Sequence, residues 1–252
     1  MATIERGEGV NEVADEVDIR GVHLQVRYTS YPDSQQEQND RRERLIKLSR
    51  DTTIASKRLI FLLHRFPSSS ESEGEDIMTE AQSQMQSIHA NFHSMSADLM
   101  NHDYYKYHRA FSPGVQEYLE AVLFKEYLQT KTLLTLEKAQ SDIKESDAEG
   151  REFIITHMDY LLGIADFTGE LMRLCINSVA LGQHEEVDLH LKFLPFLPMS
   201  INDRELGKKY EVMKQSLIKV ENVVFNVTVR GTEYPKEMIL DRANDDGQPM
   251  EE

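Results

Sequence analysis

The chain has few of the residues that build disulfide frameworks, membrane spans or β-rich domains. Its 252 residues include one cysteine, Cys175, which excludes an intrachain disulfide and a cysteine metal cluster and fits a reducing compartment. The longest apolar runs, such as Leu59 to Leu63, are too short to span a membrane. No charged-then-apolar leader opens the sequence. Twelve glycines and seven prolines are few for a β-rich protein. We therefore expect a soluble, intracellular, helix-rich protein with no membrane partner.

Basic residues are also in short supply. The chain has 28 Lys and Arg against 44 Asp and Glu, a net charge of −16. This balance argues against strong binding of nucleic acid by the chain without a partner. Most of this charge, −13, lies in three stretches poor in large apolar residues: 1–18, 71–76 and 241–252. We interpret them as a disordered acidic head, a solvated loop and a disordered acidic tail. The remainder of the chain is then nearly neutral.

Apolar residues recur at alternating steps of three and four over 45–66, 78–99 and 206–227. This spacing places one apolar seam along each helix and is typical of helical bundles. The first helix is predicted to extend from about 33 to 66. No stretch shows a convincing strand pattern, so the sequence predicts an all-α bundle of five or six mostly long helices.

Local signals place the remaining helices. Ser112 and Pro113 form a good N-cap and first-turn pair for a helix running to about Lys138. The polar stretch after it ends this helix or separates it from the next, which is expected over about 151–182. A proline-broken connector follows at 194–198.

Carboxylates on two of these helices stand among apolar residues. Glu117 and Glu120 share a face of a helix that is apolar on two sides, and Asp166 and Glu170 lie one turn apart on the polar row of the next. Buried carboxylates must be paired, protonated or bound to metal. An all-oxygen cluster of this kind suits Mg²⁺, Mn²⁺ or Ca²⁺. Arg173, one turn from Glu170, is placed to contact a phosphate.

Other interpretations of these polar residues compete with this one. Either acidic pair alone is more often a solvated helix face. His89 and His93, four residues apart, suggest zinc but have no obvious third ligand. Asp159 is expected to pair with another helix, and Cys175 to pack in the core. Gly207-Lys208-Lys209 lacks the spacing of a phosphate loop and is interpreted as a helix start.

Longer motifs resemble the translin family, in its translin-associated factor X branch. The likeness covers about residues 30–240 and rests on RLIKLSRD at 44–51, KRLIFLLHR at 57–65, HDYYKYHRAFSPG at 102–114 and DYLLGIADFTGELMR at 159–173. It implies an all-α bundle of about six to seven mostly long helices over 29–240, flanked by disordered acidic segments at 1–28 and 241–252.

The resemblance also implies a function. Members of this branch assemble with translin into a hollow hetero-oligomer, a Mg²⁺-dependent endoribonuclease for single-stranded RNA. The family's catalytic, metal-holding carboxylates fall on Glu117, Glu120, Asp166 and Glu170, with Mn²⁺ as a substitute metal. The implied roles are passenger-strand removal in RNA silencing and processing of transfer-RNA precursor fragments, with single-stranded DNA as a further ligand.

Two implied features are less specific. A cytoplasmic and nuclear location is expected, with Arg41-Arg42 and Lys57-Arg58 as a candidate nuclear signal, although surface charges on a helix explain these pairs equally well. The alternative function is a non-enzymatic partner that regulates the nucleic-acid binding and stability of translin. An oxygen-activating di-iron or manganese bundle ranks last, because no Glu-x-x-His pair accompanies Asp166 and Glu170.

Overall fold

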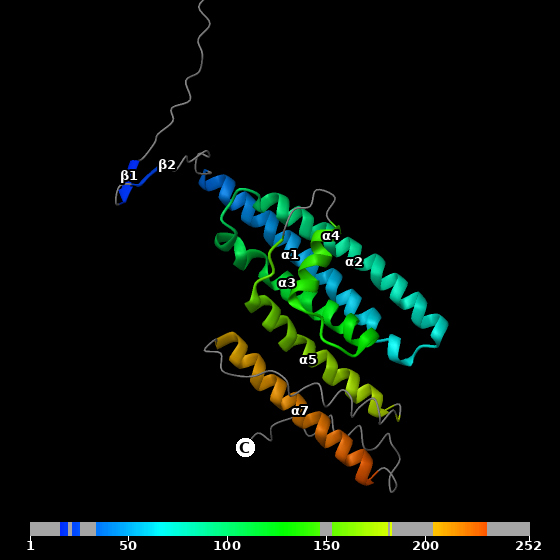
Figure 1. Ribbon diagram of the computed structural model, residues 1–252. Coiled ribbons are helices and arrows are strands. Elements are labelled where there is room, and N and C mark those ends of the chain that lie inside the picture. Colours follow the sequence, from blue (N-terminus) through cyan, green and yellow to red (C-terminus); the bar gives the residue numbers. More distant parts are fainter. Residues whose placement is uncertain are drawn as a thin grey trace, which may run out of the picture. The chain divides into compact units, whose positions relative to one another are not determined.

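The computed structural model describes residues 16–19, 22–25, 34–146, 153–180, 182 and 204–230. Within these residues the chain forms six α-helices, drawn in Figure 1: α1 Gln35–Leu63, α2 Glu71–Leu99, α3 Tyr104–Thr130, α4 Leu136–Ser146, α5 His157–Ala180 and α7 Arg204–Arg230. The predicted all-α class is confirmed. In the described part of the chain, no helix is long and apolar enough to cross a membrane.

Two short strands near the N-terminus depart from the sequence prediction. Strands β1 (Glu16–Ile19) and β2 (Val22–Gln25) pair antiparallel, so the expectation of a chain without strands is wrong here. The chain divides into two units, residues 1–40 and residues 41–252. The disorder expected for 1–28 stays a prediction, because most of that range lies outside the described residues. The expected acidic tail and the proline-broken connector also lie outside them.

The acidic stretch at 71–76 is helical, not the predicted solvated loop. It follows a 3₁₀ turn, Phe66–Ser68, and forms the first turns of α2. Ser70 and Glu73 make a capping box, in which the Glu73 N–H donates to Ser70 Oγ (3.5 Å) and the Ser70 N–H donates to Glu73 Oε2 (2.9 Å). The hydrogen bonds that the Ser70 N–H and hydroxyl donate to the Glu73 carboxylate lower its pKa. Acidic side chains are favourable at this positive end of the helix dipole, which is why the run is helical.

Pro113 lies inside α3, whereas the sequence predicted it in a first turn. The helix begins well before it, where the Asp103 side chain accepts a hydrogen bond from the Tyr105 N–H (3.0 Å). Ser49 of α1 hydrogen-bonds to the backbone on both sides of the proline: its hydroxyl donates to the Phe111 carbonyl (3.2 Å) and accepts from the Gly114 N–H (3.0 Å). A Cβ on Gly114 would lie 2.7 Å from the Ser49 carbonyl oxygen, so glycine permits this crossing of α1 and α3.

The predicted end of this helix is also wrong. α3 stops at Thr130, where Lys131 adopts a left-handed conformation, and part of the polar stretch expected to follow it forms α4. The Gln140 side chain of α4 holds the segment before α5, since it donates to the Phe153 carbonyl and accepts from the Ile155 N–H (2.8 Å).

The core is continuous across α1 to α5. Tyr118 and Phe124 of α3 and Phe92 of α2 are among its largest fully buried side chains. α5 crosses α3 closely at Gly163, where an added Cβ would lie 2.6 Å from the Leu119 Cβ. α7 lies beside α5 (Figure 1), with Leu206 and Leu162 in a small apolar cluster between them. α5 is thus packed between α3 and α7.

Candidate functional site

The four predicted carboxylates line one cleft of about 710 Å³. Glu117 and Glu120 extend from α3, and Asp166 and Glu170 from α5, whose close crossing brings the two pairs together. α1 and α7 supply the other walls. Glu120 is buried, with 9% of its surface exposed, and the other three carboxylates are partly exposed. The structure therefore groups in space the residues that the sequence selected by helical face.

The cleft places four carboxylates beside four basic side chains, Lys57, Lys208, Lys209 and Arg173, and the buried Glu120 is strongly perturbed. Burial, followed by the charges of Glu117, Asp166 and Glu170, raises the pKa of Glu120 to about 8. Burial also raises the pKa of Glu117, although the Lys57 ammonium lies 3.5 Å from its Oε1. Ionisation of Glu117 and Glu120 is therefore unfavourable at this place.

His64, at the end of α1, belongs to this site and was missed by sequence analysis. Its Nε2 is hydrogen-bonded to Glu170 Oε2, and that bond is the main reason why the pKa of Glu170 is lowered. The ring is almost fully buried and packs against Phe124 at a centroid distance of 4.7 Å. The available signal was spacing, since His64 follows Ile60, a residue that lines the cleft, by one helical turn.

Lys209 of α7 was also missed. Its Nζ donates to Asp166 Oδ2 (2.5 Å) and to Gln116 Oε1 (3.3 Å), joining α7 to both carboxylate-bearing helices. The sequence correctly placed it near a helix start but gave it no role. Arg173, the predicted phosphate contact, lines the cleft with its guanidinium 3.8 Å from Glu170 Oε2, and 55% of its side chain is exposed.

Comparison with known proteins identifies the family. The family model described as the Translin family matches residues 40–231. The chain belongs to the translin family. This translin-family chain is 38% identical to Translin-associated protein X of Mus musculus over 245 residues, covering 86% of this chain and 83% of the mouse protein. It is 32% identical to the Translin-associated protein X homolog of Schizosaccharomyces pombe over 217 residues, covering 82% and 89%.

A solved structure agrees with the fold. The crystal structure of apo-NeC3PO matches with a TM-score of 0.55 over 75% of this chain and 91% of that one. At 16% sequence identity, this likeness concerns the fold alone. The motif-based resemblance to the translin family is confirmed by the comparisons, while the roles of individual residues rest on the geometry of this chain.

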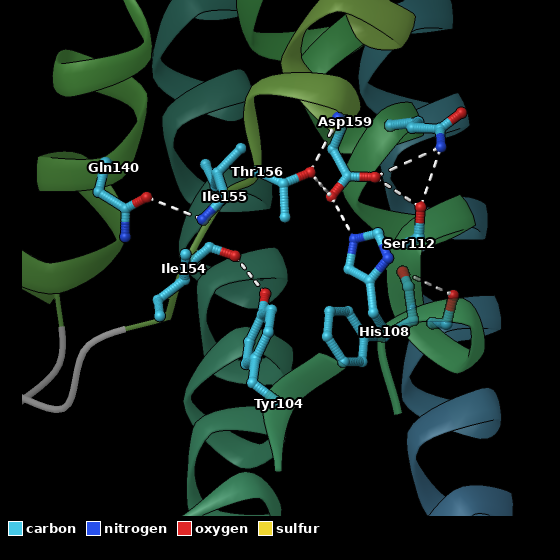
Figure 2. Close-up of polar contacts among 11 residues, drawn as sticks. Tyr104, His108, Ser112, Gln140, Ile154, Ile155, Thr156 and Asp159 are labelled. Atoms are coloured by element: carbon cyan, nitrogen blue, oxygen red, sulfur yellow. Dashed lines mark hydrogen bonds and ion pairs between the residues drawn. The ribbon is translucent and has the colours of Figure 1, made fainter. Parts of the chain in front are cut away.

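A second polar cluster supports the start of α5 in this translin-family chain. Figure 2 shows Asp159, which is almost fully buried, hydrogen-bonded to Ser112 Oγ (2.5 Å) and to His108 Nε2 (2.6 Å) of α3. Thr156 donates to the same carboxylate (2.7 Å) and accepts from the Asp159 N–H (3.1 Å), which caps α5. Asp159 therefore pairs with another helix, as expected.

This cluster reaches the cleft through one residue. The Gln116 amide nitrogen donates to Ser112 Oγ (3.0 Å), and its oxygen accepts from Lys209. The contacts that fix the start of α5 thus continue to the lysine that pairs with Asp166. We interpret the cluster as positioning Asp166 and Lys209.

The histidine pair on α2 has structural partners. His89 Nε2 lies 2.9 Å from the Tyr118 hydroxyl, and His93 Nε2 lies 3.3 Å from the Ile143 carbonyl oxygen. Burial, and secondarily the neighbouring His93, lowers the pKa of His89 to about 4. These contacts join α2 to α3 and α4 through hydrogen bonds, which is a structural role.

The donor set of the cleft fits a hard cation. Among the described residues, no three His, Cys, Asp or Glu side chains are grouped closely enough to form a ready-made metal site. The four carboxylates nevertheless offer oxygen ligands alone, which Mg²⁺ prefers. Burial first, and the neighbouring carboxylates second, raise the pKa of Glu120, and a divalent cation bound beside it would favour its ionised form.

Proposed function

We propose that this chain is the catalytic subunit of a Mg²⁺-dependent endoribonuclease that cleaves single-stranded RNA within an assembly containing translin. The observation that carries the proposal is Glu120, buried in a cleft with three further carboxylates from two helices. Perturbed carboxylates gathered in a cleft are typical of functional sites.

The position of each residue in the cleft indicates its proposed role. Glu117, Glu120, Asp166 and Glu170 would hold the metal, Mg²⁺ or Mn²⁺. When bound, the cation supplies Lewis-acid activation of water and stabilises negative charge on the phosphodiester. His64 fixes the orientation of Glu170.

Two cationic side chains of the cleft have separate roles. Arg173 offers an exposed guanidinium beside Glu170 and is placed to contact a phosphate oxygen. Lys209 holds Asp166 in place from α7. These cations offset the repulsion between an acidic cleft and a polyanionic strand.

The relatives support the proposed partner and role. Two of them carry the name Translin-associated protein X, and we extend an association with translin to this chain. Passenger-strand removal and transfer-RNA precursor processing in cytoplasm and nucleus belong to the same proposal, as does binding of single-stranded DNA.

Cleavage by the reconstituted assembly tests this function. The full-length chain is co-expressed with translin and supplied with end-labelled single-stranded RNA in Mg²⁺, in Mn²⁺ or in EDTA. Glu120→Gln and Asp166→Asn should each reduce cleavage at least a hundredfold in Mg²⁺. Glu126→Gln is the matched control, since it removes a carboxylate from α3 outside the residues that line the cleft.

A different result would favour the non-enzymatic alternative. In that case Glu120→Gln and Asp166→Asn would retain any RNA cleavage of the assembly, and this chain would contribute through association alone. Leu217→Asp, which places a charge on the α7 side chain packed against the core, should then be the damaging change.

A further inference from the structure

A large aromatic side chain lies exposed at the rim of the cleft. Phe61 of α1 has 68% of its surface exposed. It lines the carboxylate cleft and also a shallower neighbouring groove of about 440 Å³. Lys57 lines both as well, so the two hollows adjoin along α1.

Basic side chains outnumber acidic ones in the groove. Lys57, Arg58 and Arg65 line it with exposed side chains, and Arg58 makes no ion pair with any residue that the structure describes. Glu80 is the acid among its described lining residues, and its carboxylate accepts a hydrogen bond from the Gln84 amide (3.1 Å). The balance of charge favours an anionic ligand in the groove.

The spacing of these residues suits a single strand of nucleic acid. Lys57, Phe61 and Arg65 follow one another at steps of four and span about 12 Å at a rise of about 1.5 Å per residue. That length matches roughly three to four stacked nucleotides at about 3.4 Å each. A base stacked on an aromatic ring, with cations on the neighbouring phosphates, is the usual means of binding a single strand.

We propose that Lys57, Arg58, Phe61 and Arg65 form a track that delivers single-stranded RNA to the carboxylate cleft, with a base stacked on Phe61 and phosphates held by the three cations. This inference rests on the proposed function and specifies how its substrate enters. RNA suits the groove better than a protein does, because Phe61 is the one exposed large apolar side chain among its described lining residues and three cations accompany it. The basic pair Lys57-Arg58, noted in the sequence, is thus part of the proposed track.

RNA binding without cleavage tests the track. The full-length chain assembled with translin is mixed in EDTA with a fluorescein-labelled single-stranded RNA of 20 nucleotides. Affinity is measured by anisotropy, and ultraviolet crosslinks are mapped by mass spectrometry. Phe61→Ala should weaken binding about tenfold and abolish crosslinks to the α1 peptide that contains residue 61, as loss of one stacked base predicts. Phe61→Tyr, which keeps the ring, should retain both.

Ile54→Ala is the matched control, because Ile54 is a half-exposed apolar residue on the same helix outside this groove. It should bind and crosslink like the unchanged chain. Unchanged affinity in Phe61→Ala, with no crosslink to α1 in the parent chain, would overturn the proposal. Loss of translin from the Phe61→Ala chain, without any α1 crosslink in the parent, would also overturn it and assign the groove to a protein contact.

The two proposals fail separately. An assembly that crosslinks RNA through Phe61 but cuts none in Mg²⁺ would refute the proposed cleavage and leave the track standing. An assembly that cuts RNA equally well with Phe61→Ala, and binds it equally well, would refute the track alone.

Discussion

The burial of Glu120 makes the stability of the folded chain depend on pH. Its ordinary pKa of 4.5 rises to about 8 in the folded protein. The folded chain therefore keeps a proton that the unfolded chain has released, and stability falls as pH rises from about 4.5 through about 8. His89 has the opposite effect at lower pH: its pKa is lowered to about 4, so its contribution is lost as pH falls below 6.5.

Replacing Glu120 by its neutral isostere should remove this loss at high pH. In metal-free buffer, Glu120→Gln should raise the melting temperature at pH 8 by about 5 °C or more and have little effect at pH 5. Thermal unfolding followed by circular dichroism at both pH values measures this. An equal effect at the two pH values would show that the carboxylate is not held protonated by its surroundings.

His64 should matter to the chemistry and little to the fold. His64→Phe keeps an aromatic ring against Phe124 and removes the nitrogen that bonds to Glu170. We expect RNA cleavage by the translin assembly to drop about 10- to 100-fold, in line with other side chains that orient metal ligands. The measurement is cleavage rate against Mg²⁺ concentration, with assembly checked by gel filtration. A rate within twofold of the parent would remove His64 from the site.

At the scale of elements, the site depends on how closely α5 approaches α3. Gly163 permits that approach, because a Cβ there would meet Leu119 at 2.6 Å. Gly169, on the same helix, has no atom within 4 Å of its own added Cβ. Alanine substitutions at the two positions therefore distinguish the destabilisation caused by overpacking from the intrinsic helix propensity of alanine.

Alanine at these two positions should have opposite effects on stability. Gly163→Ala should lower the free energy of unfolding by about 1–3 kcal/mol through overpacking. Gly169→Ala should raise it by about 0.5–1 kcal/mol, since alanine is the better helix former. Urea denaturation of both variants measures the difference. A stabilising Gly163→Ala would mean that the two helices lie further apart than described.

At the scale of the whole molecule, charge sets the need for a partner. The net charge is −16, and the cationic groove and rim are small against it. Protein–phosphate affinity comes mainly from Lys and Arg, so the chain by itself is poorly suited to attract RNA. A partner that brings the strand to the cleft would resolve this mismatch.

The isolated chain should therefore bind single-stranded RNA at least tenfold more weakly than its assembly with translin, at equal salt and in EDTA. Removing residues 241–252, which carry five of the 44 acids, should tighten binding by the isolated chain about twofold because repulsion falls. Anisotropy titrations measure both affinities. An isolated chain that matches the assembly would show that the partner is dispensable for substrate capture.

The predictable parts of this protein were those set by local periodicity. Four carboxylates could be selected because a helical repeat fixes which residues share a face. His64 and Lys209 could not, because their roles depend on how α1 and α7 pack against other helices. The place of Pro113 inside α3 was missed for a related reason: Ser49, distant in sequence, hydrogen-bonds to the backbone on both sides of Pro113.

The position of Lys209 on the last described helix has a consequence for biosynthesis. The ribosome produces α3 and α5 first, so their carboxylates exist before α7 can supply its ammonium group to Asp166. The α7 wall of the cleft is also missing until then. A nascent chain thus carries an incomplete carboxylate cleft, which is completed only when α7, the last described helix, has left the ribosome.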